Sequence, residues 1–306
     1  MRKIPLVIIA GPTASGKTAL SVNIAKALGG EIVSADSMQI YKYMNIGTAK
    51  PTEEEKQGVP HYMMDFLEPS VNFSVADYCE MASEIIRDID ARGKIPVMVG
   101  GTGLYIDSLV NGVDFGESDG DEALRNELEA LAKKEGNEAV HKILEEIDPE
   151  TAEKYHPNNL RRIIRAIEVY KTQGVTVSEK AKEEKTSPYN AIYFCIDWDR
   201  EVLYDRINRR VDIMAEEGLL DEVKDLLNRN IDPKCTAMQS IGYKEFYGYL
   251  KNEMTLDEAL DTIKQSSRRY AKRQLTWFRR NKDIHWLNPE TAEADVMEII
   301  KEKFGI

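Results

Sequence analysis

The segment that most restricts the possible fold is residues 11–18, whose sequence GPTASGKT matches the pattern G-x-x-x-x-G-K-[ST]. It follows the short apolar run Ile4–Ala10 and leads into Lys17–Leu28, where apolar residues recur at helical spacing. The glycines let backbone N–H groups turn toward phosphate oxygens, and the helix presents its positive end to the same anion. Lys17 adds a mobile charge, and the Thr18 hydroxyl is suited to a magnesium ion. The pattern therefore predicts a strand, a phosphate-binding loop (P-loop) and a helix, without deciding which polyphosphate is bound.

The next segments continue the alternation of strand and helix. Residues 31–35 and 95–99 are apolar runs of strand length, and Val75–Ala91 between them is amphipathic with a helical period. The second apolar run is closed by Gly100 and Gly101. Such an alternation predicts a parallel sheet covered by helices, which is the α/β class.

The character of the sequence changes near residue 115. Residues 117–173 have the pattern of charged helices with thin apolar stripes, and strand character returns after residue 190. We therefore predict an α/β fold whose P-loop NTPase-like core, a parallel sheet flanked by helices, is made of residues 1–114 and 190–306. Residues 115–189 are predicted to form a helical insertion domain.

Polar turns follow the predicted strands. Asp36 comes directly after the second strand, and a general base and a helix N-cap are both open interpretations of its position. Gln39 carries a donor and acceptors, which suits it to the edge of a base. A third turn, residues 100–105, surrounds the Thr102 hydroxyl with glycines that permit close backbone approach. Because the carboxyl ends of parallel strands meet at one edge of a sheet, these turns are predicted to lie beside the P-loop.

The net charge of −12 hides an uneven distribution of charge. Residues 117–155 hold 13 acidic and 5 basic side chains, whereas residues 268–280 hold six basic side chains and no acidic one. A smaller basic group is formed by Arg161, Arg162 and Arg165. A basic helix is often only a solvated face, so the charge pattern allows a nucleic-acid partner without requiring one.

The sequence gives no sign of a membrane or an oxidising compartment. No apolar run approaches the roughly 20 residues that a membrane-spanning helix needs. The first ten residues lack a small-residue cleavage site and are better explained as a buried strand than as a signal peptide. The cysteines Cys79, Cys195 and Cys235 are far apart and suggest neither a disulfide framework nor a zinc site. We expect a cytoplasmic protein without a membrane partner.

The P-loop alone leaves several classes of protein open. Asp197 follows the apolar residues 192–196 and imitates a Walker B acid, although a turn residue after a strand is the simpler explanation. An ATP-dependent kinase of a small metabolite or nucleotide is therefore one alternative. A P-loop RNA-binding module without catalysis is another.

Several blocks occur together in one order: GPTASGKT, SADSMQIYK, IGTAKP, GVPHYMMD and VGGTGLYI, then HPNNLRRIIRAIEVY, RINRRVDIM, SIGYKEF and YAKRQLTWFRR. In this order and spacing they resemble the bacterial tRNA dimethylallyltransferase family, also called tRNA isopentenyltransferases. The resemblance covers nearly the whole chain and is weakest in residues 117–155. It implies a prenyltransferase that moves a dimethylallyl group from dimethylallyl diphosphate to the exocyclic N6 amine of the adenine 3′ of the anticodon in tRNA, releasing pyrophosphate.

The resemblance also implies roles for individual residues. The P-loop would hold the diphosphate instead of a nucleotide, with Mg²⁺ at Thr18, through Gly11, Thr13, Ala14, Ser15, Gly16, Lys17 and Thr18. Asp36 would take the proton from the adenine amine, and Thr102 would position that adenine. Lys17 and Arg210 would stabilise the leaving pyrophosphate, with Arg206, one turn earlier, as the alternative to Arg210.

A further set is assigned by the resemblance to the anticodon stem-loop of tRNA. It comprises Asp36, Ser37, Met38, Gln39, Thr102, Arg161, Arg162, Arg165, Gln239, Gly242, Tyr243, Lys244, Lys272, Arg273, Trp277 and Arg280. Two groups have a simpler explanation: Trp277 and Phe278 as core residues, and the arginines at 161–165 as partners of Glu168. The C-terminal helices of the core are thus expected to bind tRNA, and we expect a monomer.

Overall fold

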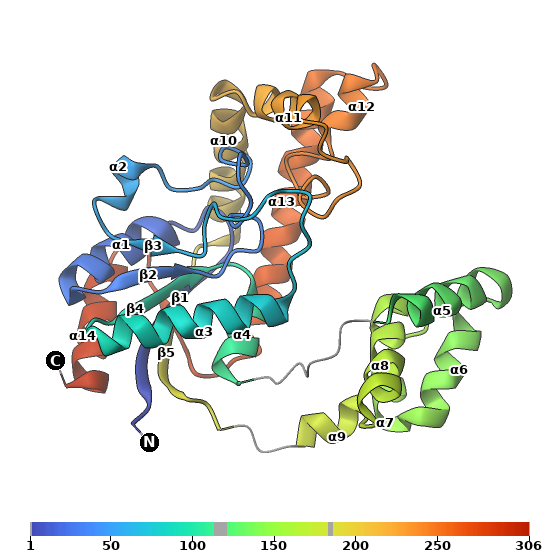
Figure 1. Ribbon diagram of the computed structural model, residues 1–306. Helices are drawn as coiled ribbons and strands as arrows, with labels where there is room; N and C mark the ends of the chain where they lie inside the picture. Colours follow the sequence, from blue (N-terminus) through green and yellow to red (C-terminus); the bar gives the residue numbers. More distant parts are fainter. Residues whose placement is uncertain (1, 113–120, 183–185, 306) are drawn as a thin grey trace. The chain divides into compact units, whose positions relative to one another are not determined.

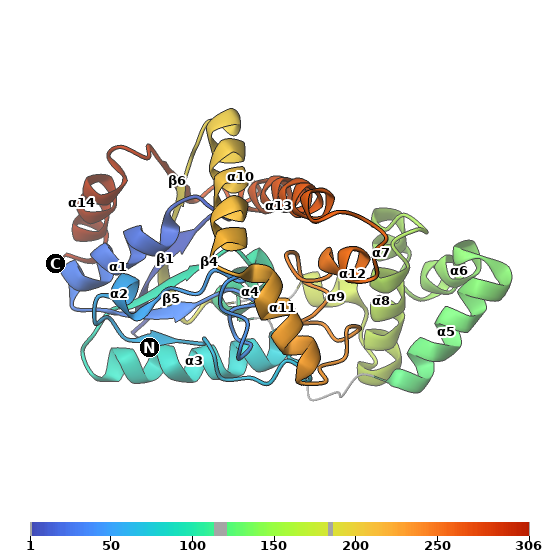
Figure 2. The ribbon, with the colours of Figure 1, turned by 90° about the horizontal axis from the view of Figure 1, so that it is seen from above.

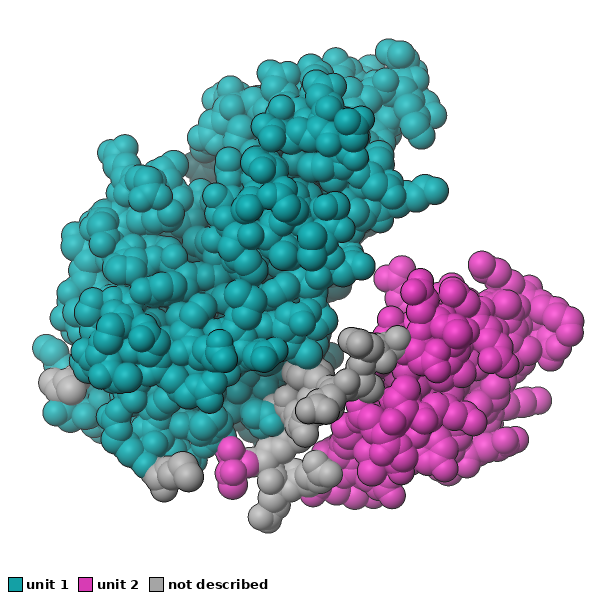
Figure 3. All heavy atoms as spheres, in the orientation of Figure 1, with its two compact units in different colours: residues 1–112, 187–306 teal, residues 113–186 magenta. Residues whose placement is uncertain are grey.

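The computed structural model describes residues 2–112, 121–182 and 186–305. The chain divides into two compact units, residues 1–112 with 187–306 and residues 113–186 (Figure 3). The predicted boundary between residues 114 and 115 lies outside the described residues. Each unit has a core of its own and is described by itself.

The larger unit contains a six-stranded sheet in the order β3-β2-β4-β1-β5-β6, and every pair of neighbours in it is parallel (Figure 1). The strands are β1 (Ile4–Ala10), β2 (Glu31–Ser34), β3 (His61–Tyr62), β4 (Pro96–Gly100), β5 (Tyr189–Ile196) and β6 (Ile284–Leu287). The predicted α/β class with a parallel sheet is confirmed. The sequence does not predict the edge strands β3 and β6, because two and four residues are too few to show a period.

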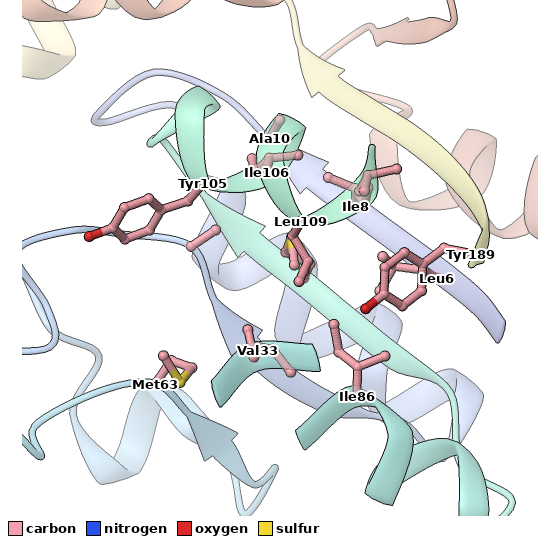
Figure 4. Packing of buried hydrophobic residues seen from close by; sticks show 14 of the residues in the cluster. Leu6, Ile8, Ala10, Val33, Met63, Ile86, Tyr105, Ile106, Leu109 and Tyr189 are labelled. Atoms are coloured by element: carbon pink, nitrogen blue, oxygen red, sulfur yellow. The ribbon is translucent and has the colours of Figure 1, made fainter. Parts of the chain in front are cut away.

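β1 is buried on both faces, so its alternate residues belong to two different cores. The helices that cover these faces are α1 (Lys17–Leu28), α3 (Val75–Ala91), α4 (Gly103–Val110) and α14 (Ala292–Phe304). Leu6, Ile8 and Ala10 pack with side chains of α3 and α4 (Figure 4). Val7 and Ile9 pack with α1 and α14, which lie on the opposite side of the sheet from α3 (Figure 2). Two-sided burial explains why the strand is a continuous apolar run instead of an alternating one.

The C-terminal helices of this unit form a third core. They are α10 (Arg200–Glu216), α11 (Leu219–Asn228), α12 (Phe246–Leu250) and α13 (Leu256–Phe278). The chain after β2, which contains the short α2 (Glu53–Lys56), packs into the same core through the buried side chains of Ile40, Tyr41 and Met44. α13 is 23 residues long, but neither it nor any other helix in the described ranges is apolar enough to cross a membrane.

The smaller unit is helical throughout its described residues. Its helices are α5 (Glu122–Glu135), α6 (Asn137–Ile147), α7 (Pro149–Lys154), α8 (Leu160–Gln173) and α9 (Val177–Lys182). Leu128, Val140, Leu144, Ile163 and Ile167 are buried together in its core. The helical character predicted for the insertion is confirmed. The described acidic residues between 121 and 155 are exposed, except Asp148, whose carboxylate caps α7.

Candidate active site

The larger unit holds a cavity of about 340 Å³ at the carboxyl ends of β1, β2 and β4. Three segments of its lining are the turns predicted to meet at this edge: the P-loop, the turn after β2, and the end of β4. The others come from residues 47–64, α10, α13 and the loop before α12. The polar and charged side chains among the lining residues are Thr13, Lys17, Thr18, Asp36, Ser37, Gln39, Thr48, His61, Arg210, Gln239, Ser240, Ser267, Tyr270, Arg273 and Gln274.

The P-loop offers free backbone donors. The N–H groups of Ala14, Gly16, Lys17 and Thr18 donate to no acceptor within the described residues. Gly16 is the N-cap of α1 and has a φ of 91°, a backbone conformation that glycine adopts without steric cost. Several unpaired N–H groups beside a helix N-terminus form a site for an anion.

Side chains from distant elements hold the P-loop from outside the cavity. The Nε of Arg206 donates to the carbonyl oxygen of Ala14 at 2.9 Å, and the Nε1 of Trp198 donates to that of Ser15 at 2.8 Å. Since these bonds fix the carbonyl groups, they also fix the N–H groups of the same peptides. These two bonds therefore restrain the Ala14 and Ser15 carbonyl groups, whereas the Thr13 peptide bonds to Gln274 of α13.

Lys17 and Arg210 are half-buried and line the cavity together with the exposed Arg273, and none of the three forms an ion pair in the described part of the chain. The Nζ of Lys17 donates to the carbonyl oxygen of Pro12 at 3.1 Å. Burial lowers the pKa of Lys17 to about 8, an effect that Asp36 opposes and Arg210 reinforces. Burial also lowers the pKa of Arg210, again against the influence of Asp36. A desolvated cation without a partner is costly, and a bound anion removes that cost. The charge arrangement and the free N–H groups therefore favour the same kind of ligand.

The structure separates the two candidate arginines of α10. Arg210 lines the cavity, whereas Arg206 is occupied by its bond to Ala14 and does not line the cavity. The geometry thus favours Arg210 over Arg206 as the arginine that meets a bound anion.

The position of Asp36 is compatible with both interpretations of the sequence, a capping residue and a general base. Its Oδ1 accepts hydrogen bonds from the backbone N–H groups of Met38 at 2.9 Å and Gln39 at 3.4 Å, so it caps a turn, although not a helix. Its Oδ2 has no hydrogen-bond partner among the residues that the structure describes. One carboxylate oxygen therefore fixes the side chain, and the other is available to a ligand in the cavity.

Thr102 lies behind this turn and does not line the cavity. Its Oγ1 accepts from the Ser37 N–H at 3.1 Å, and its own N–H donates to the carbonyl oxygen of Ala35 at 3.1 Å. The Gln39 side chain also forms hydrogen bonds within the protein. Its Nε2 donates to the carbonyl oxygens of Thr48 and Ala49 at 3.2 and 3.1 Å. In this structure both side chains support the turn, and their contacts with adenine stay predictions.

The glycines of the turn after β4 permit close approach by the protein itself. A Cβ at Gly101 would lie 2.1 Å from the Nε2 of Gln274, and one at Gly103 would lie 2.3 Å from the Trp277 ring. Trp277 also donates from Nε1 to Asp107 at 2.7 Å. Trp277 is half-buried and packs against the start of α4, which fits the core explanation, and Phe278 is buried.

Several polar residues of this cavity are not among the predicted site residues, and His61, Tyr270 and Gln274 are three of them. The Nε2 of His61 is buried without a hydrogen-bond partner among the described residues, and burial lowers the pKa of its imidazole. Burial raises the pKa of Tyr270 to about 12, and the charge of Asp36 adds to this shift. Tyr270, Gln274 and Trp277 recur at helical spacing, and this spacing is the sequence signal that places them on one face of the helix.

The remaining residues predicted to contact tRNA differ in exposure. Gln239, Lys244, Lys272, Arg273 and Arg280 are exposed, and Gly242 is buried but lines the cavity. Tyr243 is fully buried, and its hydroxyl donates to Glu222 at 2.7 Å, so its side chain is not accessible to RNA in this structure.

The three arginines of the smaller unit that are predicted to contact tRNA differ in their ion-pair partners. Arg165 and Arg125 both pair with Glu168, at 2.5 and 2.7 Å, and the Glu168 side chain is fully buried. Arg161 and Arg162 are exposed and form no ion pair within the described ranges. The alternative explanation by pairing with Glu168 thus applies to Arg165 alone.

A model of the family described as IPP transferase matches residues 39–281 of the sequence. The chain belongs to the IPP transferase family. The match includes the turn after β2 from Gln39 onward, α10 and α13, all of which contribute to the cavity.

Known proteins similar to this IPP transferase match almost its whole length. A tRNA dimethylallyltransferase of Halalkalibacterium halodurans is 51% identical over 301 residues, covering 97% of this chain and 96% of the relative. The crystal structure of the full-length tRNA isopentenylpyrophosphate transferase from Bacillus halodurans is 48% identical, with a TM-score of 0.74, and covers 99% of this chain and 96% of that one. A solved eukaryotic dimethylallyltransferase acting on tRNA is 31% identical, with a TM-score of 0.86, over 98% of this chain and 79% of its own.

The polar groups of the cavity are compatible with a divalent metal ion that also binds a phosphate-containing ligand. No group of three or more His, Cys, Asp or Glu side chains in the described ranges is arranged to bind a metal. The Thr18 hydroxyl does line the cavity beside Lys17. Mg²⁺ typically keeps several waters and takes one or two protein ligands together with substrate phosphates.

Proposed function

We propose that this chain transfers a dimethylallyl group from dimethylallyl diphosphate to the N6 amine of the adenine 3′ of the anticodon in tRNA, releasing pyrophosphate. The proposal rests on one observation: an anion site and a free carboxylate oxygen line the same cavity. Lys17, Arg210 and the P-loop N–H groups form the first, and the Oδ2 of Asp36 is the second.

In this proposal the diphosphate occupies the P-loop. The exocyclic amine of adenine is a weak nucleophile because its lone pair is delocalised into the ring, so the allylic C–O bond must be largely broken as the C–N bond forms. Lys17 and Arg210 stabilise the negative charge that develops on the departing oxygens. Preorganised charges of this kind contribute roughly 3–4 kcal/mol each. Mg²⁺ at Thr18 would supply further positive charge to the same leaving group.

Part of the cavity wall is apolar and suits the hydrocarbon part of dimethylallyl diphosphate. Ile207, Val211 and Met214 of α10 and Ile263 of α13 line it beside Arg210. An apolar wall excludes water from an allylic group that is becoming positively charged, and thus limits its hydrolysis.

Asp36 acts as the general base. Its Oδ1 is held by the turn, so Oδ2 has a fixed direction from which to take the proton of the N6 amine. Such a proton transfer typically contributes about 10²–10⁴-fold to the rate. Thr102 keeps the turn in place through Ser37 and so positions both Asp36 and the adenine beside it.

The tRNA contributes its anticodon stem-loop, with the reactive adenine extruded from its stack at a cost of a few kcal/mol. Exposed Lys272, Arg273 and Arg280 on and after α13 would contact phosphates, as would Arg161 and Arg162 in the smaller unit. Gln239 and Lys244 add polar contacts at the loop before α12.

The test is a transfer assay with radiolabelled dimethylallyl diphosphate, Mg²⁺ and unmodified tRNA carrying adenine 3′ of the anticodon. Label should enter tRNA with the wild type and be lost with Asp36→Ala and Lys17→Ala. Lys26→Ala, an exposed lysine at the other end of α1, is the matched control and should retain activity. Phosphate transfer from ATP to a small acceptor, without label in tRNA, would instead support a kinase.

A further inference from the structure

Gln274 joins the two glycine-rich turns of the site through one side chain. It lies on α13 and is 6% exposed. Its Oε1 accepts from the backbone N–H of Thr13 in the P-loop at 3.0 Å, and its Nε2 donates to the carbonyl oxygen of Gly101 at 2.9 Å. Neither turn is adjacent to α13 in sequence, so both depend on this helix for a bond that their own segments do not provide.

The chemistry of the two bonds requires an amide at this position. One bond needs an acceptor and the other a donor, and a primary amide supplies both from one planar group. A carboxylate would face the Gly101 oxygen with a second acceptor, and an apolar side chain would leave both backbone groups unpaired, at about 1–3 kcal/mol each. Gly101 completes the arrangement, because any Cβ there would lie 2.1 Å from the Nε2 of Gln274.

The opposite face of the same helix segment is basic and exposed. Lys272 and Arg273 immediately precede Gln274 and are exposed, and Arg273 also lines the cavity, whereas Gln274 is buried and Tyr270 is half-buried. A polyanion bound along the outer face of α13 therefore acts on the helix whose inner face holds the P-loop and the turn after β4.

We propose that Gln274 is a positioning residue that couples the binding of tRNA on α13 to the binding of diphosphate in the P-loop; this inference rests on the proposed function. Fixing α13 by tRNA contacts restrains the Gln274 amide, and with it the Thr13 peptide and the adjacent P-loop N–H groups. Dimethylallyl diphosphate then binds to a P-loop that bound tRNA has already ordered, so less conformational entropy is lost when the diphosphate binds. Because coupling between two sites is reciprocal, bound diphosphate strengthens tRNA binding by the same factor.

The experiment measures the dissociation constant of magnesium pyrophosphate by calorimetry, on the full chain, with and without a saturating tRNA anticodon stem-loop. The ratio of the two constants is the coupling factor, which we expect to be about fivefold or larger for the wild type. Gln274→Met, of similar volume but without the amide, should bring it close to one. Gln265→Met on an exposed position of the same helix is the control and should keep the wild-type factor. Gly101→Ala displaces the Gln274 amide without altering it and should act like Gln274→Met.

Kinetics separate positioning from a general loss of structure. A variant that is only partly folded has fewer active molecules, which lowers kcat and leaves KM for dimethylallyl diphosphate unchanged. Loss of positioning should raise that KM at saturating tRNA by several-fold. Absence of coupling in the wild type, or unchanged coupling in both Gln274→Met and Gly101→Ala, overturns the inference while the enzyme still transfers label. Failure of wild-type transfer overturns the proposed function instead.

Discussion

The guanidinium carbon of Arg206 lies 4.4 Å from the centre of the Trp198 ring, and both side chains bond to carbonyl oxygens of the P-loop. This stacked pair lies outside the cavity and links α10 to the P-loop. One helical turn later, Arg210 reaches the cavity. Of two arginines on one helix, one therefore bonds to the P-loop and the other lines the cavity, and we expect different functions for them.

Arg210→Ala should lower kcat about 10²–10³-fold, because it removes a charge directed at the leaving pyrophosphate. Its melting temperature should change little, since Arg210 forms no ion pair in the described part of the chain. Arg206→Ala should instead lower stability by about 1–3 kcal/mol and weaken diphosphate binding. Single-turnover rates and thermal unfolding of both variants check this contrast. A larger loss of kcat in Arg206→Ala than in Arg210→Ala would reverse the assignment.

Asp36→Asn separates the two functions of this carboxylate. An asparagine retains the oxygen that accepts from the Met38 and Gln39 N–H groups, so the turn and the melting temperature should be preserved. It lacks the base, and the transfer rate should fall about 10²–10⁴-fold. Asp36→Ala should lose the same rate and also some stability. Near wild-type transfer by Asp36→Asn would remove Asp36 from the mechanism.

The features that the sequence predicted are those encoded by neighbouring residues. The P-loop is recognisable because its glycines, Lys17 and Thr18 occur in one stretch between a strand and a helix. The parallel sheet follows from continuous apolar strands such as β1, whose alternate residues enter two cores. Asp36 and the turn after β4 were found because both directly follow predicted strands.

The features that escaped prediction depend on contacts between distant segments. Gln274 lies 261 residues from the Thr13 peptide that it binds, and nothing local to either residue indicates the other. Tyr243 likewise bonds to Glu222, a partner that its own segment does not indicate, and its predicted contact with RNA stays a prediction. The sequence shows which side chains are polar, but their hydrogen-bond partners depend on how the chain folds.

Glu222 offers a test of how the segment lining the cavity is held. Its carboxylate accepts from the backbone N–H groups of Asn45, Ile46 and Gly47 at 2.7, 2.8 and 3.0 Å, and from the Tyr243 hydroxyl. Glu222→Ala leaves these donors unpaired, and we expect a loss of about 3 kcal/mol in the free energy of unfolding. Urea unfolding checks this value. The neighbouring Asp221→Ala, at an exposed position paired only with Lys224, should change stability by less than about 0.5 kcal/mol; equal losses in the two variants would contradict the expectation.

Glu31 gives the protein a predictable response to acid. Hydrogen bonds from Arg92 are the main cause that lowers its pKa from 4.5 to about 2, and its side chain is only 2% exposed. A carboxyl with a depressed folded-state pKa stabilises the fold above its unfolded value and loses that contribution as pH falls toward 2. The contribution is on the order of 3 kcal/mol at neutral pH. Glu31→Gln should therefore flatten the dependence of stability on pH between about 5 and 2, as measured by urea unfolding across that range. An unchanged slope would show that another group causes the acid sensitivity.

Arg161 and Arg162 should bind RNA, whereas Arg165 should stabilise the smaller unit. Reversing both exposed arginines to glutamate should weaken tRNA binding and make its salt dependence shallower by about 1.5 in the log–log slope, since each phosphate contact contributes roughly 0.7–0.9. Arg165→Ala leaves the buried Glu168 with Arg125 as its remaining partner, so it should lower the melting temperature with a smaller effect on that slope.

The matched control for the double reversal is Lys133→Glu with Lys134→Glu, which changes the same amount of charge on the exposed part of α5. Fluorescence anisotropy with a labelled anticodon stem-loop at several salt concentrations distinguishes the two pairs. If the lysine pair shifts affinity as much as the arginine pair, the effect is one of overall charge, and the two arginines are not a specific contact. A loss confined to the arginine pair would instead identify the start of α8 as part of the tRNA surface.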